Sequence, residues 1–559
     1  MSALNWISSK LFAGDTVYAR HTYGGIRPQS FKQHSLRSRI MSTPIPAQLT
    51  IPVGAADGGT ITQLVAVGEQ VLKYQKLASI QLNRDGCSEV FAHAPTSGVI
   101  AEIKSARVAD HRIQQQLCLL LTTDGHDDAL VVEPSYDPVN LNSAEIVDII
   151  REAGIIGMGG AGFPSADKLD SAFNSAIDIL IINATECEPY ITADESLIRE
   201  RAKKTVLGAE LLQRACSATR CVFAIEESKR DAIEALTKAL QADTEVASSC
   251  ELVIIPTKYP AGSENLLIHC VTGIEVPSGE YPAQSGVLML NSGTAYAVCE
   301  AVVQGKPCIS RITTLCGETL QTPKNFEVLI GTSANFLFDL CGIDNSVAHR
   351  SIVGGPLMGR ELNADDAVIY KTTNCLIAAG PADIPMPAEE RACIRCGFCA
   401  DVCPVRLLPQ QLLAFSKSSD TDALVEHGLF DCIECGACDY VCPSHIALVS
   451  TYKDSKACIE ARQQEVDRSA YWQQRFQYRQ YRLKKDKDQS LARKSANKTP
   501  APKLEKKATP APLPNGQDFF SKEKASAEIA AAVARVKARR EAKTRVNGES
   551  HAAPKDDPK

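Results

Sequence analysis

Eight cysteines stand in two nearly identical runs in the last third of the chain. The first run is Cys393-x2-Cys396-x2-Cys399-x3-Cys403-Pro404. The second is Cys432-x2-Cys435-x2-Cys438-x3-Cys442-Pro443. This spacing is typical of bacterial proteins that hold two [4Fe–4S] clusters, because three closely spaced thiolates wrap one corner of a cluster in a tight loop. The residue types therefore predict electron transfer.

In this arrangement the fourth cysteine of each run ligates the cluster of the other run. We assign cluster 1 to Cys393, Cys396, Cys399 and Cys442, and cluster 2 to Cys432, Cys435, Cys438 and Cys403. The two runs must then fold against each other. A pair of structural zinc sites is the alternative, but zinc sites use paired Cys-x2-Cys half-sites rather than triplets.

A second group of residues that could bind a ligand is the glycine-rich loop of residues 157–162. Glycine permits positive φ and lets backbone N–H groups approach an anion, with a helix N-terminus behind them. The loop lacks the full dinucleotide fingerprint, and on these residues alone a packing turn is as good an interpretation. About twenty residues later a strand ends in the polar stretch 183–190, and such strand ends face the ligand crevice of α/β sheets. Its Asn183, Glu186 and Glu188 could bond a flavin ribityl chain or a nicotinamide ribose, with surface carboxylates as the alternative.

Length and composition predict several well-packed domains whose cysteines are reduced. The 559 residues correspond to three to five domains at roughly 100–200 residues each, and 44% of them are hydrophobic. Cysteines outside the two runs are scattered singly, as expected of thiols that act as small core residues in a cytosolic protein. No apolar run is long enough to span a bilayer, and the N-terminus lacks a signal-peptide core.

Charge is unevenly distributed along the chain. Residues 482–559 carry 20 Lys and Arg against 10 Asp and Glu, whereas the whole chain has a net charge of −6. A basic tail on an acidic body suggests an anionic partner, with a solvated disordered tail as the alternative. Nucleic acid is not expected as a partner, because the tail has almost no interleaved aromatic residues.

The pattern of apolar residues predicts a multidomain α/β protein. Valine alternation through Gly68 indicates short strands, and apolar runs at 177–182 and 252–255 indicate buried parallel strands. Between the cysteine runs, residues 407–416 and 421–427 read as helices, with Asp420 or Thr421 as N-cap. The predicted segments are an extension (1–45), a β-rich module (46–125), an α/β domain (138–300), a β domain (305–362), a helical cluster domain (388–450), a long helix (451–487) and a largely disordered basic tail (488–559) with a helix near 525–543.

The order of several motifs resembles a known family. Residues 157–168, 183–189, 259–264 and 291–294 resemble the flavin and NADH site of the NADH-binding subunit of respiratory complex I. The chain is still more similar to the RnfC/RsxC family, a component of the Rnf ion-translocating electron transport complex. The phrases shared with that family are Gly-Gly-Ile-x-Pro at 24–28, His-Ala-Pro-Thr-Ser-Gly at 93–98, Val-Pro-Ser-Gly at 276–279, Gly-Gly-Pro-Leu-Met-Gly at 354–359 and the paired cysteine runs, within a match over 20–480.

The resemblance implies a barrel-sandwich (lipoyl-like) module, a Rossmann-like flavin domain, a β-grasp (SLBB-like) domain and a two-cluster ferredoxin-type domain. It places FMN against Gly157, Gly159, Gly160, Gly162 and Lys168. It assigns the ribityl and phosphate parts to Asn183, Glu186, Asn291 and Thr294, and the NADH side to Phe163, Glu188 and Glu264. Thr185 and Ser263 depart from the complex I pattern, which has carboxylates at both positions.

The expected function is that of an electron-input subunit. Electrons would pass between NADH, FMN and two [4Fe–4S] clusters to the other subunits of the membrane complex, and indirectly to or from ferredoxin. The chain would be peripheral, on the cytoplasmic face of the bacterial inner membrane, and hydride transfer would need no catalytic acid or base. The alternative is an iron–sulfur relay and docking subunit without its own flavin or NADH activity, which Thr185 and Ser263 favour.

Overall fold

A computed structural model describes residues 17–19, 22–54, 59–82, 89–110, 115–132, 138, 140–160, 162–173, 175–242, 250–362, 367–384 and 388–496. The chain divides into two compact units, residues 1–467 and 468–559. The helix expected at 525–543, and the basic tail beyond residue 496, lie outside the described residues.

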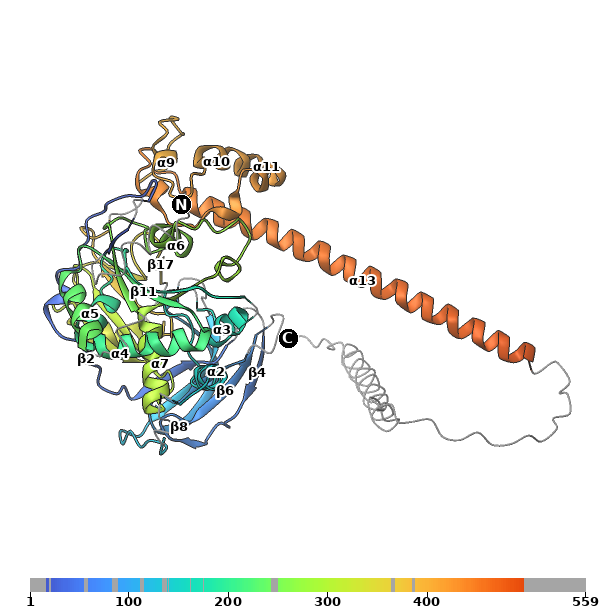
Figure 1. The fold of residues 1–559 in the computed structure, drawn as a ribbon, viewed down its shortest axis with the longest axis horizontal. Helices are drawn as coiled ribbons and strands as arrows, with labels where there is room; N and C mark the ends of the chain where they lie inside the picture. Colours follow the sequence, from blue (N-terminus) through green and yellow to red (C-terminus); the bar gives the residue numbers. More distant parts are fainter. Residues whose placement is uncertain are drawn as a thin grey trace, which may run out of the picture. The chain divides into compact units, whose positions relative to one another are not determined.

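Two antiparallel sheets form the N-terminal module (Figure 1, blue). One contains β3 (Gln48–Pro52), β9 (Gln115–Thr123), β8 (Gly98–Arg107) and β5 (Gln70–Val71) in that order. The other contains β4 (Thr60–Gln63), β6 (Lys76–Gln81) and β7 (Glu89–His93). Inward-facing residues such as Leu49, Leu77 and Leu119 share one core, so the two sheets are packed as a sandwich.

A parallel five-stranded sheet forms the centre of the α/β domain. Its order is β1 (Val17–Tyr18), β12 (Cys250–Ile255), β11 (Arg220–Glu226), β10 (Ile179–Ala184) and β13 (Val287–Asn291). The helices α2 (Ser143–Glu152), α3 (Ser165–Phe173), α4 (Ala193–Cys216), α5 (Arg230–Ala242) and α7 (Ser292–Gln304) share one core with it, and α6 (Glu264–Thr272) belongs to a second core. β10 and β12 lie where the apolar runs predicted buried strands. Their carboxyl ends meet at one edge of the sheet.

A mixed six-stranded sheet follows in the chain. Its order is β17 (Arg360–Glu361), β16 (Arg350–Val353), β18 (Cys375–Ala379), β14 (Ser310–Cys316), β15 (Lys324–Leu329) and β2 (Met41–Ser42), and α8 (Ala334–Leu340) packs against it. The sheet extends past residue 362, where we expected this domain to end. The reason is β18, an entirely buried strand whose continuous apolar run carries no period-two alternation. The N-terminal extension contributes β1 and β2 to two different sheets.

Short helices surround the two cysteine runs: α9 (Phe398–Asp401), α10 (Pro409–Ser418), α11 (Thr421–Glu426) and α12 (Ala437–Tyr440). Single 3-10 turns occur at Ser35–Arg37, Pro282–Ser285 and Leu429–Asp431. The two helices predicted between the runs are present, and the Asp420 side chain accepts a hydrogen bond from the N–H of Ala423 (3.1 Å) as N-cap. α13 (Leu448–Ala496) continues past the predicted end at 487, because no Gly or Pro interrupts it before Pro500.

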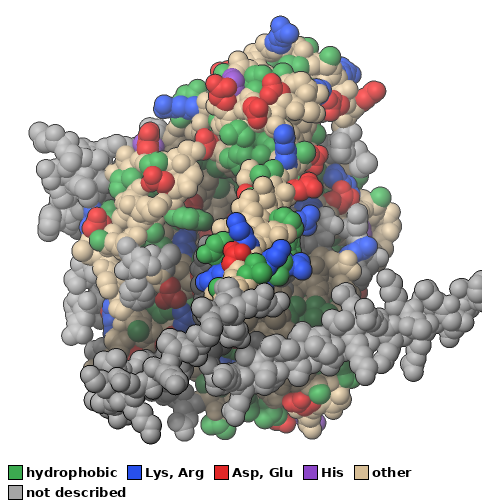
Figure 2. Space-filling model, turned by 90° about the vertical axis from the view of Figure 1, so that its right-hand side faces the viewer, with side chains coloured by type: hydrophobic (Ala, Val, Ile, Leu, Met, Phe, Trp, Pro, Cys, Tyr) green, Lys and Arg blue, Asp and Glu red, His purple; other side chains and the backbone are tan. Residues whose placement is uncertain are grey.

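The surface and the remaining cysteines agree with a chain that packs several apolar cores. Apart from Cys187 and Cys458, the described cysteines outside the two runs are buried. On the face shown in Figure 2, acidic and basic side chains are interspersed with hydrophobic ones. No helix among the described residues is both long and apolar enough to cross a bilayer.

Candidate flavin and iron–sulfur sites

The glycine loop between Ile156 and Pro164 is closed at its base by a β-bridge between these two residues. The N–H of Gly157 donates to the carbonyl of Phe163 (2.7 Å), and α3 starts directly behind the loop. The N–H groups of Gly159 and Gly160 donate to no acceptor in the described part of the chain. Two free amides in front of a helix N-terminus fit a bound phosphate.

Two of the predicted flavin residues lie against this loop from the end of β13. The Thr294 hydroxyl accepts a hydrogen bond from the N–H of Met158 (3.0 Å). A Cβ added to Gly159 would lie 3.4 Å from the side chain of Asn291, at van der Waals contact, so the two residues are neighbours. Asn291 also caps α7 by accepting from the N–H of Gly293 (2.8 Å).

Lys168 on α3 faces the same edge of the sheet. Its ammonium donates to Glu264 Oε1 (2.7 Å) and to the carbonyl of Met289 (2.7 Å). Glu264 is the first residue of α6, and Asn183 at the end of β10 donates to the carbonyl of nearby Gly262 (2.9 Å). The structure therefore gathers these predicted residues around the glycine loop.

Glu186 and Glu188 have other partners. The Glu186 carboxylate accepts from the N–H groups of Asp194 (2.7 Å) and Glu195 (3.2 Å) at the start of α4. Glu188 Oε1 accepts from the N–H groups of Leu357 (2.9 Å) and Met358 (2.8 Å), and burial raises the pKa of Glu188 to about 7. Both carboxylates thus hold protein segments in place.

One pocket of the cluster domain contains cysteines from both runs. This pocket is lined by Cys403 from the first run together with Cys432, Cys435 and Cys438 from the second. Its other walls are apolar, and Tyr452 closes it with its hydroxyl bonded to the carbonyl of Pro409 (2.6 Å). These four thiols are the donor set of a [4Fe–4S] cluster, in which each thiolate binds a different iron. Among the described residues, no three such side chains are placed to hold a single metal ion.

The two runs repeat the same backbone turns. Positive φ recurs at matching positions, at Arg395 and Glu434 and again at Gly397 and Gly436. Each run then enters a short helix, α9 or α12. The runs are therefore structural copies. They differ in exposure, since Cys393 and Cys396 of cluster 1 are exposed, whereas three of the four cluster 2 ligands are buried.

Cluster 2 lies beside the α/β domain. The Tyr259 hydroxyl donates to the carbonyl of Cys435 (2.6 Å), and this tyrosine is 2% exposed. The N–H of Gly25 donates to the carbonyl of Val402 (2.7 Å), and a Cβ on Gly24 would lie 2.7 Å from the backbone of Cys403. The Gly-Gly-Ile-x-Pro phrase is thus a close-packing site against the cluster 2 ligands.

Matched glycines in the two runs allow a test of this packing. Gly436 (φ 74°) and Gly397 (φ 85°) both have a backbone conformation that costs a side chain about 1–2 kcal/mol. A Cβ at 436 would lie 2.7 Å from the carbonyl oxygen of Leu357, whereas nothing lies within 4 Å at 397. We therefore expect Gly436→Ala to lower the free energy of unfolding by about 1–3 kcal/mol more than Gly397→Ala. Chemical unfolding of both variants measures this, and equal losses would contradict the packing.

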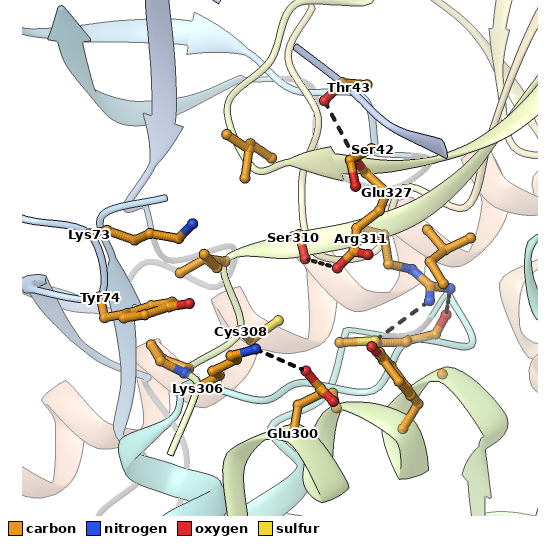
Figure 3. A pocket seen from close by; sticks show the side chains of 18 of the residues that line it. Ser42, Thr43, Lys73, Tyr74, Glu300, Lys306, Cys308, Ser310, Arg311 and Glu327 are labelled. Carbon is orange, nitrogen blue, oxygen red and sulfur yellow. Dashed lines mark hydrogen bonds and ion pairs between the residues drawn. The ribbon is translucent and has the colours of Figure 1, made fainter. Parts of the chain in front are cut away.

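A pocket of about 380 Å³ lies on another side of the loop (Figure 3). Met158 and Arg311 line it, but none of the predicted flavin residues does. Its charged side chains are paired, Lys73 with an aspartate (2.7 Å) and Lys306 with Glu300 (3.8 Å). We assign no ligand to it.

Three parts of the chain match models of known protein families. Residues 20–126 match the RnfC barrel sandwich hybrid domain, residues 150–300 the Nuo51 FMN-binding domain, and residues 392–446 a 4Fe-4S dicluster domain. The fold and the two sites thus define an oxidoreductase subunit that combines FMN with two [4Fe–4S] clusters.

Several relatives of this chain carry the name of the C subunit of the ion-translocating oxidoreductase complex. The protein of this name from Yersinia enterocolitica is 41% identical over 481 residues, which cover 86% of this chain and 67% of the relative. Its counterpart from Yersinia pestis is also 41% identical, with 76% of its length covered. The chain belongs to this RnfC family and is a peripheral electron-transfer subunit. A NAD⁺-reducing [NiFe]-hydrogenase chain is 19% identical with a TM-score of 0.40 over 55% of this chain and 60% of its own, too distant to support an argument.

Sequence motifs missed several residues that support the sites. In the sequence, Tyr259 is recognisable only as the first residue of the motif at 259–264. Its contact with Cys435 depends on the fold. Arg311, whose guanidinium donates to the carbonyl of Met158 (3.0 Å), stands in an ordinary strand pattern. In the sequence, the only sign that the N-terminal extension and the second cysteine run pack closely was the presence of glycine at 24, 25 and 436.

Proposed function

We propose that the chain accepts electrons from NADH at its FMN site and passes them through cluster 2 and then cluster 1 to membrane subunits of an ion-translocating complex. The observation that carries this proposal is the hydrogen bond from Tyr259 to Cys435, which joins the FMN-binding domain to the cluster 2 pocket. A bound flavin accepts electrons in pairs and passes them on singly, which links a hydride donor to one-electron clusters.

The residues around the loop have separate roles in this proposal. The free N–H groups of Gly159 and Gly160 bind the flavin phosphate, and Lys168 contributes a positive charge. Glu264 at the start of α6 is available to the hydroxyl groups of NADH. The exposed cluster 1 cysteines suit electron exit, because a partner must approach that cluster closely.

A relay without flavin is the second candidate, and the surroundings of Asn183 favour it. Asn183 Oδ1 accepts from both the N–H (3.0 Å) and the hydroxyl (2.7 Å) of Thr185, while its Nδ2 donates to Gly262. The amide is thus already bonded within the protein. Anaerobically purified chain decides between the two candidates: flavin released by acid and bleaching of the clusters by NADH support the first, and clusters without either support the second.

Membrane attachment is proposed to involve the basic C-terminal region. Residues 482–493 of α13 are exposed, and residues 482–559 carry the surplus of Lys and Arg. Anionic lipid at the cytoplasmic face attracts such a segment by about 1 kcal/mol per basic residue near the surface. We expect deletion of 482–559 to shift the chain from the membrane to the soluble fraction, and unchanged retention would contradict this role.

A further inference from the structure

A cluster of buried charges lies behind the flavin residues and has no part in the electron path proposed above. Among the described residues it comprises four carboxylates and three cations. The carboxylate of Glu188, which also interacts with Lys32, is left out of this count because it is bonded to the N–H groups of Leu357 and Met358. The carboxylates are Glu186, Asp194, Glu195 and Glu226, and the cations are Lys32, Lys229 and Arg311. With every group ionised, the cluster carries one uncompensated negative charge, and an unpaired charge in a protein interior is costly.

Three of the carboxylates have close cationic partners. Lys229 Nζ lies 3.4 Å from Glu186 and 3.3 Å from Glu195, and the lysine side chain is 2% exposed. Arg311 lies 3.8 Å from Asp194, and Figure 3 shows it among the side chains that line the pocket. Although burial opposes it, the surrounding carboxylates raise the pKa of Lys229, so this lysine stays charged.

Glu226 is the carboxylate left over. It ends β11 at the carboxyl edge of the sheet and is 2% exposed, and its Oε1 has no hydrogen-bond partner among the described residues. Burial raises the pKa of Glu226 to about 7, with Lys229 and Lys32 acting in the opposite direction. The charged or titratable groups that face it are Lys32, Glu186, Cys187, Glu195 and Lys229.

The cluster is connected to the flavin site through α4. Glu186 binds the N–H groups of Asp194 and Glu195, and Asp194 Oδ2 accepts a hydrogen bond from Asn291 Nδ2 (2.5 Å). Asn291 in turn lies against Gly159 of the loop. A change of charge at a bound flavin would therefore reach Asp194 of the cluster through Asn291, across an interior of low dielectric.

We propose that Glu226 takes up a proton from water when a hydride enters the flavin site. The proton offsets the negative charge that the hydride adds, so Glu226 acts on the flavin from a distance and not as a catalytic residue. The inference rests on the proposed function. The hydride of NADH brings two electrons and one proton, so its arrival adds one negative charge, which the proton bound at Glu226 offsets. When the two electrons leave singly for the clusters, the proton of the hydride and the proton of Glu226 return to water.

The test counts protons taken up per two electrons during spectroelectrochemical titration of the flavin in the full-length chain. At pH 8 Glu226 is mostly ionised before reduction, so the wild type should take up one more proton than Glu226→Gln. At pH 6 Glu226 is already protonated, and the two proteins should behave alike. Glu227→Gln, which changes the exposed neighbour, is the matched control and should follow the wild type at both pH values.

Redox-difference infrared spectroscopy gives a second measurement, in which a band that is present in the wild type and absent from Glu226→Gln is assigned to Glu226 and not to Glu188. Reduction at pH 8 should produce the C=O band of a protonated carboxyl group, and reduction at pH 6 should not. Equal proton uptake by the wild type and Glu226→Gln at pH 8, or no carboxyl band, would overturn the role of Glu226 alone. A chain that binds no flavin would overturn the proposed function and this inference with it.

Discussion

Cys403→Ser should remove cluster 2 and leave cluster 1, although Cys403 belongs to the first cysteine run. The reason is that Cys403 lines the same pocket as Cys432, Cys435 and Cys438. We expect the anaerobically purified variant to hold about half of the iron of the wild type and to lose one reduced-cluster EPR signal. Because Tyr259 joins cluster 2 to the flavin domain, reduction of the remaining cluster by NADH should slow by at least about tenfold.

Double variants make this prediction sharper. Cys403→Ser combined with Cys438→Ser should lose no more iron than either single change, because both remove the same cluster. Cys403→Ser combined with Cys396→Ser should lose nearly all of it. If each run held its own cluster, the two double variants would exchange these outcomes. Cys458→Ser is the control, since Cys458 is exposed and lies outside both runs.

The cysteine pairing could be predicted from spacing, which is a local property of the sequence. It remains a prediction, which the pocket shared by Cys403 and the second run supports. The strands β10 and β12 and the Asp420 cap were predictable for the same reason, since apolar runs and capping residues act locally. The N-terminal strands β1 and β2 were not, because a strand of two residues has no periodicity of its own and exists only through pairing with distant partners.

The candidate flavin site was likewise predictable only where its features are local in the sequence. The glycine loop and the polar strand ends were recognisable, and the structure places Lys168, Glu264 and Asn291 around them. The network of Lys229 and Glu226 was not recognisable, because its members lie in separate segments that no motif connects. Their effect arises from burial and mutual distance, which only the folded chain defines.

Lys168→Ala should weaken FMN binding, while Glu264→Gln should preserve or strengthen it. Lys168 is the cation that faces the glycine loop region, and a hydrogen bond between charged groups contributes about 1.5–3 kcal/mol. Its loss should therefore raise the Kd for FMN by roughly 10- to 100-fold. Glu264 now competes for the same ammonium at 2.7 Å, so Glu264→Gln frees Lys168 for the flavin.

Titration of flavin-free chain with FMN, followed by the change in flavin fluorescence, measures both effects. Glu264→Gln should nevertheless slow bleaching by NADH, because this residue is proposed to face the nicotinamide nucleotide. Lys203→Ala, an exposed lysine on α4, is the control for loss of a positive charge and should bind FMN as the wild type does. Equal Kd values for Lys168→Ala and Lys203→Ala would mean that Lys168 serves only its ion pair with Glu264, and the flavin would then depend on the loop amides alone.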